Sequence, residues 1–369
     1  MRESYMHLAH PKPGRSIIKM APNANIPIID VSKAVDEADV ARQVVDAAAQ
    51  HGFIYIKNTG DFIGLSDIDG AFDLSRKLFK APIEEKAACS IQTNNRGWSG
   101  MHSETLDPKT QKVGDYKEAF NFGEFADGKA QQPLPATIQP DEPQVNAFRE
   151  QCHSLCLRLL YLLGLGLDVS PPDFFSSAHL PSRGPSGTIL RLLYYPATSA
   201  SNAAPDAVRA GAHSDYGSIT LLFRLEGQAG LEILTRENAW APVPVRPPGT
   251  EDDALPPILV NIGDLLSYWT NGLFRSTVHR VVFSGDAAPV EGESDTGPRY
   301  SIAFFCHPVG ATALEPVPSD RVKNFKPEAG TPNANPYAER KVVTADEHLH
   351  MRLKESYKDL YKEEEQAKA

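Results

Sequence analysis

The chain has 369 residues and a formal net charge of −10, and 41% of its residues are hydrophobic. Its length allows a large buried core, in one elaborated β domain with helical flanks or in two domains. The acidic balance and the lack of a basic stripe argue against a nucleic-acid partner, and no apolar run reaches the roughly 18 residues of a membrane span.

The first half of the chain predicts an α/β region behind an irregular N-terminal arm. Residues 1–25 contain scattered proline and glycine, which is typical of a flexible arm. Hydrophobic periodicity then predicts a helix over residues 32–50, a strand over 53–57 and a second helix over 65–79. We expect residues 26–180 to form this N-terminal α/β region.

A polar segment and a long helix complete the region. Residues 90–136 carry scattered glycine, proline and aromatic residues, a composition that suits the mouth of a pocket or a plain surface excursion. The apolar pattern over residues 141–165 predicts a central helix. Cys152, His153 and Cys156 lie within that pattern, so we interpret them as core residues and not as metal ligands.

The second half of the chain is rich in β structure. Short β runs separated by turn signals dominate residues 188–307, which predicts two packed sheets. The expected fold is mainly β with flanking helices, around a double-stranded β-helix (jelly roll) core at residues 181–335. In the C-terminal helical segment, residues 336–369, Thr344 and Glu347 match a capping box in front of a last helix.

Cysteine usage bears on the cellular compartment. The four cysteines are too few and too scattered for a disulfide framework. Because the N-terminus also lacks the apolar core of a signal peptide, we expect a cytoplasmic protein. The sequence does not indicate the oligomeric state.

The strongest candidate for a functional site is the pair His213 and Asp215 together with the distant His279. The first two precede a β-rich run, so we place them where a strand begins, with both side chains on one face. Two histidines and one carboxylate on one face suit a non-haem Fe(II) that keeps open positions. An H-x-D pair alone is weak support, since a lone histidine is more often structural.

A second motif, R-Y-S, follows the distant histidine. Arg299 and Ser301 share one face of the predicted strand, and an arginine fork with a neighbouring hydroxyl can hold a carboxylate. A surface salt bridge would explain the arginine equally well if it stood alone. The order H-x-D, then H-R-V, then R-x-S is far more specific than any of its parts.

With these motifs the chain resembles the 2-oxoglutarate and Fe(II)-dependent dioxygenases, in the branch of isopenicillin N synthase and the plant flavonoid and gibberellin oxidases. Its sequence motifs are most similar to those of fungal thymine hydroxylases. The resemblance covers most of the chain and includes I-P-I-I-D at 26–30, G-F-I-Y-I-K-N at 52–58, D-Y-K-E-A-F at 115–120, L-R-L-L-Y-Y-P at 190–196 and V-N-I-G-D-L-L-S-Y-W-T-N-G at 260–272.

The resemblance implies that His213, Asp215 and His279 ligate Fe(II). Metal-binding histidines usually need neighbours that fix their orientation, and Asn261 and Asp264 are candidates, although Asp264 suits a turn cap better. The resemblance also implies that 2-oxoglutarate occupies two positions on the iron and dioxygen the last. The co-substrate is then decarboxylated to succinate and CO2 while a C–H bond of a small molecule is oxidised, most often by hydroxylation.

The resemblance further implies an anchor for the co-substrate. Arg299 and Ser301 would hold the distal carboxylate of 2-oxoglutarate, and Tyr195 would touch it. Leu193 stands where many plant members have asparagine, so any contact made by that asparagine is absent. The connection at residues 283–298 is longer than usual and reads as an exposed loop.

Substrate residues follow from the same resemblance. In the thymine hydroxylases the matching positions line the substrate pocket, which here implies Asn95, Arg191, Tyr216 and Phe305. Trp98 replaces the tyrosine of the N-R-G-Y motif. Each residue also has a structural explanation: a turn, a buried ion pair, strand packing or the core. An aromatic platform with amide and guanidinium donors suits a planar polar ring, and it could also serve an amino acid or a polyketide acid.

Alternative functions remain open at the level of sequence. One is an iron oxidase of the same fold that works without 2-oxoglutarate, as isopenicillin N synthase does. Another is fragmentation of 2-oxoglutarate itself, and a more distant one is a non-catalytic jelly-roll binding protein. Neither the substrate nor the choice among hydroxylation, desaturation and ring chemistry can be derived from the residues.

Overall fold

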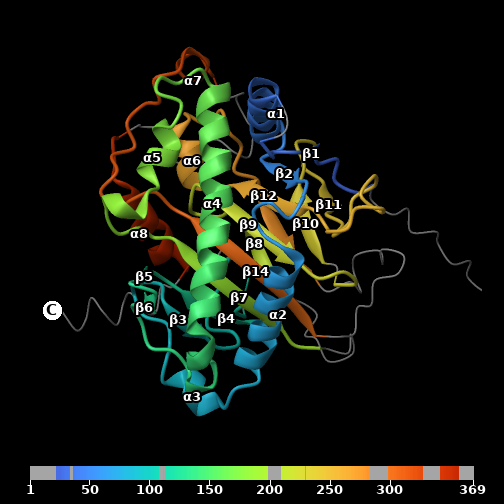
Figure 1. Cartoon of the computed structure of the whole chain (residues 1–369), viewed down its shortest axis with the longest axis vertical. Helices are drawn as coiled ribbons and strands as arrows, with labels where there is room; N and C mark the ends of the chain where they lie inside the picture. Colours follow the sequence, from blue (N-terminus) through green and yellow to red (C-terminus); the bar gives the residue numbers. More distant parts are fainter. Residues whose placement is uncertain are drawn as a thin grey trace, which may run out of the picture.

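The computed structural model describes residues 22–33, 36–107, 111, 113–197, 209–228, 230–282, 298–326 and 341–356. Two sheets lie face to face, and helices cover the outer face of the larger sheet (Figure 1). Most of the N-terminal arm and nearly all of the long connection at 283–298 lie outside the described residues. The domain boundaries proposed from the sequence stay predictions.

The larger sheet has eight strands and the smaller one four. In the larger sheet the spatial order is β1 (Ile28–Ile29), β2 (Phe53–Ile56), β12 (Ile258–Ile262), β9 (Ile219–Arg224), β14 (Arg299–Cys306), β7 (Ile189–Tyr195), β4 (Glu118–Phe122) and β3 (Gly97–Ser99). In the smaller sheet it is β11 (Trp240–Pro242), β10 (Leu231–Leu234), β13 (His279–Val281) and β8 (Ala210–His213). A short hairpin joins β5 (Phe125–Ala126) to β6 (Lys129–Ala130).

The two sheets enclose one apolar cluster between them. Leu231, Ile233 and Val281 of the smaller sheet pack with Leu259 and Ala303 of the larger one. Inward side chains alternate along such strands with side chains that face the covering helices. The predicted jelly-roll core is therefore confirmed, and its interior is where the site lies.

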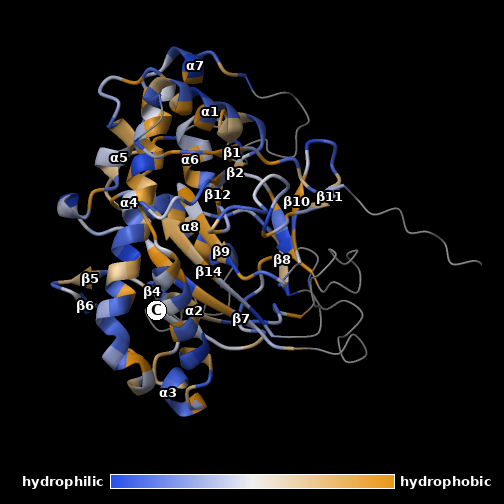
Figure 2. Ribbon diagram, turned by 45° about the vertical axis from the view of Figure 1, so that its right-hand side comes forward, coloured by the Kyte–Doolittle hydropathy of each residue, from blue (hydrophilic) through white to orange (hydrophobic). Residues whose placement is uncertain are grey.

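Helices flank this core. They are α1 (Glu37–Gln50), α2 (Leu65–Phe79), α3 (Ile83–Ala87), α4 (Glu142–Gly166), α5 (Phe174–Ala178), α6 (Asp264–Trp269), α7 (Asp320–Lys323) and α8 (Ala345–Ser356), with 3-10 turns at Ala136–Asp141 and Pro181–Arg183. The long helix α4 crosses the outer face of the larger sheet, where the rings of Phe148 and Phe223 lie 5.3 Å apart. In Figure 2 the central strands of that sheet are mainly hydrophobic, whereas α4 mixes hydrophobic and hydrophilic residues.

Most predicted helices are confirmed, with small shifts at their ends. The helix expected from residue 32 begins at Glu37, because the Asp36 side chain accepts the N–H of Asp39 and caps the first turn. Cys152 and Cys156 are fully buried in α4, which confirms them as core residues. Within the described part of the chain, no helix combines the length and the apolar character that crossing a bilayer requires.

The C-terminal helix has the predicted capping box. The hydroxyl of Thr344 accepts the N–H of Glu347 at 3.2 Å, and the Glu347 carboxylate accepts the N–H of Thr344 at 2.7 Å. Leu349 and Leu353 of the same helix reach the cavity between the sheets. The last helix therefore packs against this cavity.

The polar segment at residues 90–136 is part of a pocket and not a plain surface excursion, since Asn95 lines the cavity between the sheets. It supplies β3 and β4, and β4 pairs along its whole length with β7 in the larger sheet. Phe120 and Phe122 are fully buried there. The flanking polar and charged residues hid this strand, since several of them turn out to be buried in ion pairs.

Candidate active site

A cavity lies between the two sheets, and residues from strands of both sheets and from helix α8 line it. The larger sheet contributes β7, β9 and β14, and the smaller sheet contributes β8 and β13. Residues Leu349 and Leu353 of α8 close one side. Every candidate site residue named from the sequence lies on the wall of this cavity: Asn95, Arg191, Tyr195, His213, Asp215, Tyr216, His279, Arg299, Ser301 and Phe305.

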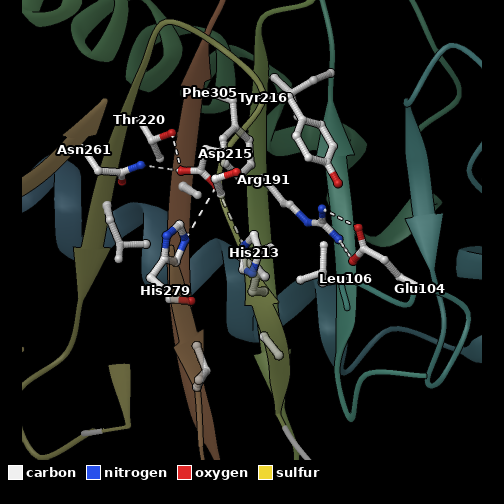
Figure 3. A pocket seen from close by; sticks show the side chains of 18 of the residues that line it. Glu104, Leu106, Arg191, His213, Asp215, Tyr216, Thr220, Asn261, His279 and Phe305 are labelled. Atoms are coloured by element: carbon white, nitrogen blue, oxygen red, sulfur yellow. Dashed lines mark hydrogen bonds and ion pairs between the residues drawn. The ribbon is translucent and has the colours of Figure 1, made fainter. Parts of the chain in front are cut away.

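Three of these side chains converge on one point. His213, Asp215 and His279 each offer one ligand atom, and these atoms lie within 4.8 Å of one another. The Nε2 atoms of His213 and His279 are 3.8 and 3.6 Å from Oδ1 of Asp215. Figure 3 shows the two imidazoles and the carboxylate facing one another.

Backbone carbonyls fix the orientation of both histidines. Nδ1 of His213 lies 2.7 Å from the Gly211 carbonyl oxygen, and Nδ1 of His279 lies 3.1 Å from that of Thr277. A carbonyl oxygen can only accept, so each Nδ1 carries the proton and each Nε2 keeps its lone pair. In each histidine the free lone pair is therefore on Nε2, the ring nitrogen that lies near Asp215.

The carboxylate of Asp215 is oriented in a similar way. Its Oδ2 accepts hydrogen bonds from Thr220 Oγ1 at 2.7 Å and Asn261 Nδ2 at 2.6 Å. The other oxygen, Oδ1, is the one that approaches the histidines. Asn261 is thus in place to orient a ligand as predicted, although it orients the carboxylate and not a histidine.

The protonation states suit a metal site. Burial, together with the neighbouring His279, lowers the pKa of His213 to about 4, so its imidazole is neutral near pH 7. Burial opposes ionisation of Asp215, but the two histidines and the hydrogen bonds from Asn261 and Thr220 outweigh it and lower the pKa of that carboxyl. Neutral imidazole and ionised carboxylate are the forms that bind metal.

One detail of the sequence prediction is wrong: His213 ends strand β8 and does not begin a strand. Asp215 lies in the loop that follows. The carbonyls of Asp215 and Tyr216 accept the N–H groups of Asp264 and Leu265, at 2.7 and 3.3 Å. These hydrogen bonds connect the loop to the start of α6, so Asp215 and Tyr216 do not pair with a neighbouring strand. The β-rich sequence around them does not reveal that their backbone bonds to α6.

Asp264 has neither of the roles considered for it. It is the first residue of α6, and Gly263 is the cap. Its carboxylate accepts the hydroxyls of Ser276 at 2.6 Å and Ser214 at 3.0 Å, and it forms an ion pair with Arg352 of α8 at 3.0 Å. Asp264 therefore connects the loop between the first two triad residues to the last helix.

The arginine of the R-x-S motif lies in an environment that suits an anionic ligand. Arg299 is 3% exposed, its guanidinium lies 4.8 Å from the ring centroid of Tyr195, and its Nη1 is 3.4 Å from Ser301 Oγ. Among the described residues its buried Nε has no hydrogen-bond partner. Burial, helped by the cations of Arg209 and Arg224, lowers the pKa of Arg299 to about 10. A carboxylate placed here would satisfy a buried donor.

The four candidate substrate residues lie on the wall beyond this arginine. Arg191 is paired with the Glu104 carboxylate, as Figure 3 shows. Asn95 has a left-handed backbone with φ of 62°, and its side-chain oxygen accepts from Asn121. Tyr216 lies under the guanidinium of Arg352, and Phe305 closes the end of the wall.

Sequence reasoning missed several lining residues. Glu104, Lys117, Leu106 and His307 all face the cavity. Lys117 and Glu104 come from the polar segment at residues 90–136, and their pairing with each other and with Arg191 brings them to the site. His307 follows the R-Y-S strand directly, which is the one signal that could have identified it.

Comparison with known proteins decides the family. Residues 26–142 match the model of the N-terminal domain of non-haem dioxygenases in morphine synthesis, and residues 186–308 match the 2OG-Fe(II) oxygenase superfamily. A 2-oxoglutarate-dependent dioxygenase of Dothideomycetidae sp. is 32% identical over 77% of this chain and 85% of its own length. The chain belongs to the 2-oxoglutarate and Fe(II)-dependent dioxygenases.

Two further known proteins are similar to this chain over most of its length. A UPF0676 protein of Schizosaccharomyces pombe is 37% identical over 79% of this chain and 84% of that protein. The crystal structure of a Neurospora crassa thymine hydroxylase with α-ketoglutarate (2-oxoglutarate) and thymine is 29% identical, with a TM-score of 0.71, over 91% of this chain and 99% of that one.

The dioxygenase uses Fe(II) and 2-oxoglutarate to oxidise a small molecule. When bound, these two groups supply the oxidising chemistry and give succinate and CO2. The donor set found here fits them, since two imidazole nitrogens and one carboxylate oxygen suit Fe(II) with open positions. The protein orients these donors and places the buried cation of Arg299 on the wall of the same cavity.

Proposed function

We propose that this dioxygenase hydroxylates a C–H bond of a small polar molecule at an iron held by His213, Asp215 and His279. In this proposal Arg299, Ser301 and Tyr195 hold the distal carboxylate of 2-oxoglutarate. The observation that carries it is the convergence of Nε2, Nε2 and Oδ1 at one point on the wall of a cavity that also contains a buried arginine without a carboxylate partner among the described residues.

The substrate would lie against Asn95, Arg191, Tyr216 and Phe305. These residues combine an amide, a guanidinium and two aromatic rings on one wall, a set that suits a planar ring with hydrogen-bonding edges. The similarity to a thymine hydroxylase crystallised with thymine supports a ring of this kind. The same fold accepts many substrates, so the proposal names a class and not a compound.

Succinate release tests the proposal. Purified protein with Fe(II), 2-oxoglutarate and dioxygen would be incubated with pyrimidines, amino acids and polyketide acids, and succinate and oxidised product would be quantified together. We expect one class to raise succinate release well above the background, with one hydroxylated product formed per succinate. Succinate release that no compound stimulates, or a product that lacks an added oxygen, would contradict hydroxylation.

The same assay separates the alternatives. Turnover of a substrate without 2-oxoglutarate would indicate an oxidase like isopenicillin N synthase. Carbon products from 2-oxoglutarate other than succinate and CO2 would indicate fragmentation of the co-substrate. Failure to bind Fe(II) under anaerobic conditions would indicate a binding protein.

We also propose that the enzyme works in the cytoplasm on a free small molecule, without nucleic acid or membrane. All four cysteines are buried free thiols, which suits a reducing compartment. The net charge of −10 opposes binding to a phosphate backbone. Fractionation of the source cells with an antibody to the protein would test the location, and recovery in the membrane pellet would contradict it.

A further inference from the structure

The paired strands β7 and β14 line the cavity, and their register gives the position of each lining residue along it. They are antiparallel neighbours, with Arg299 opposite Tyr195 and Ala303 opposite Arg191. Every second residue points into the cavity, so Arg191 lies four residues from Tyr195 along the strand, or about 13 Å. Arg191 therefore belongs to the substrate end of the cavity and not to the co-substrate end.

Three cations among the described residues line the cavity: Arg299, Arg191 and Lys117. The two at the substrate end are already paired. Glu104 accepts two hydrogen bonds from Arg191, at 2.6 and 3.2 Å, and its Oε2 lies 2.9 Å from Nζ of Lys117. Lys117 also pairs with Asp115.

These four side chains form one buried network of alternating charge. Asp115, Lys117, Glu104 and Arg191 are between 1% and 8% exposed. Burial opposes the ionised form of Glu104, but Arg191 and Lys117 outweigh it and hold the pKa of that carboxyl far below its usual range. Glu104 and Asp115 likewise raise the pKa of Lys117 although burial opposes this. Two positive and two negative charges cancel.

We propose that Glu104 is a specificity-determining residue that neutralises Arg191 and reserves the substrate end of the cavity for an uncharged polar molecule. This inference rests on the proposed function, because it assumes that the substrate faces Arg191. A carboxylate substrate would have to compete with Glu104 for the same guanidinium and would add an uncompensated negative charge to a buried site. A neutral amide or heterocycle adds no charge to the network.

The neighbouring histidine is consistent with an uncharged wall. Burial, and the proximity of His348 and His179, lower the pKa of His307 to about 3, so its imidazole is neutral near pH 7. His307 lines the same cavity and offers hydrogen bonds without charge. The polar groups at this end thus suit the recognition of amide, carbonyl and ring nitrogen atoms.

Binding of a matched pair of probes tests the inference on the wild-type protein. Benzamide and benzoate have nearly the same shape and differ in charge, and they would be titrated by calorimetry into protein loaded with Mn(II) and saturated with 2-oxoglutarate, which blocks Arg299. We expect no benzoate binding tighter than that of benzamide. Tighter binding of benzoate would overturn the inference.

Removal of the carboxylate gives the sharper test. Glu104→Gln removes the carboxylate that pairs with Arg191, so benzoate should bind roughly tenfold or more tighter than to the wild type. In the matched control Glu104→Gln with Arg191→Met, the gain should disappear. Unchanged benzoate affinity in a Glu104→Gln protein that keeps its fold would overturn the inference, and the wild-type titration decides the matter if that variant does not fold.

The experiment separates this inference from the proposed function. The affinity for 2-oxoglutarate would be measured in the same samples before each titration. Loss of 2-oxoglutarate binding in the wild type would overturn the assigned anchor, whereas preserved 2-oxoglutarate binding with a preference for benzoate would overturn only the role of Glu104.

Discussion

Thr220 donates its hydroxyl to Oδ2 of Asp215 at 2.7 Å, while Oδ1 of the same carboxylate faces the two histidines. Thr220 is the second residue of β9, so this hydrogen bond connects Asp215, in the loop, to the larger sheet. This bond and the one from Asn261 hold the carboxylate in a single orientation. Mutation of a group that orients a metal ligand in this way typically lowers metal affinity or activity by about tenfold to a hundredfold.

Thr220→Val should therefore weaken Fe(II) binding. Valine keeps the shape of threonine but cannot donate to Asp215, so we expect metal affinity to fall about tenfold to a hundredfold. Anaerobic titration with Fe(II) measures the change, and Thr220→Ser is the control that keeps the hydroxyl. Equal affinities of the valine and serine variants would contradict the role of the hydrogen bond.

Arg299→Met should separate co-substrate binding from metal binding. The variant loses a buried cation that is proposed to pair with a carboxylate, and the loss of such a pair costs about 2 kcal/mol or more, or roughly thirtyfold in affinity for 2-oxoglutarate. Iron affinity should change little, because Arg299 is not a ligand. Titrations with 2-oxoglutarate and with Fe(II) check both expectations, and an equal weakening of the two would count against the assigned role.

The metal triad and the R-x-S motif were predictable because each is carried by residues close together in the sequence or by a fixed order of motifs. His213 and Asp215 are two residues apart, and Arg299 and Ser301 share a strand face. The capping box of α8 is local for the same reason. Short-range patterns of this kind survive in a single sequence.

The charged network could not be predicted, since its members have no common period. Glu104, in the segment between β3 and β4, and Arg191 of β7 are 87 residues apart and meet only in the folded protein. The wrong placement of His213 at a strand start has a similar origin. The loop after His213 is shaped by hydrogen bonds to Asp264 and Leu265, about 50 residues later, and no local pattern announces them.

The last helix should respond to a change at Arg352. This residue pairs with Asp264 at 3.0 Å and lies 5.0 Å from the ring centroid of Tyr216, so it connects α8 to the loop of the metal site. Arg352→Met should increase hydrogen exchange at the backbone amides of residues 345–356 and raise the KM for the substrate. The affinity for 2-oxoglutarate should stay close to that of the wild type.

A matched control lies on the same helix. Met351 is 37% exposed and precedes Arg352, so Met351→Ala alters the helix surface without touching Asp264 or Tyr216. Its amide exchange should match the wild type. Exchange that rises equally in both variants would indicate general fraying of α8 and not loss of the contact with Asp264.

Two buried histidines should make the metal-free protein sensitive to mild acid. Burial lowers the pKa of His179 to about 4 and is the main cause that lowers the pKa of His307 to about 3, against an ordinary value of about 6.5. At a pH between the lowered pKa and the ordinary pKa, each of these histidines binds a proton in the unfolded chain but not in the folded protein. The free energy of unfolding therefore falls as the pH drops below about 6.5, by on the order of 1 kcal/mol for each histidine at pH 5.5.

Urea unfolding of the metal-free protein at pH 7.5 and pH 5.5 measures this loss. His179→Gln removes one of the buried histidines with a lowered pKa, so the difference in unfolding free energy between the two pH values should shrink by on the order of 1 kcal/mol, whatever the absolute stability of the variant. A difference that is unchanged in His179→Gln would mean that His179 is not the group whose protonation opposes folding.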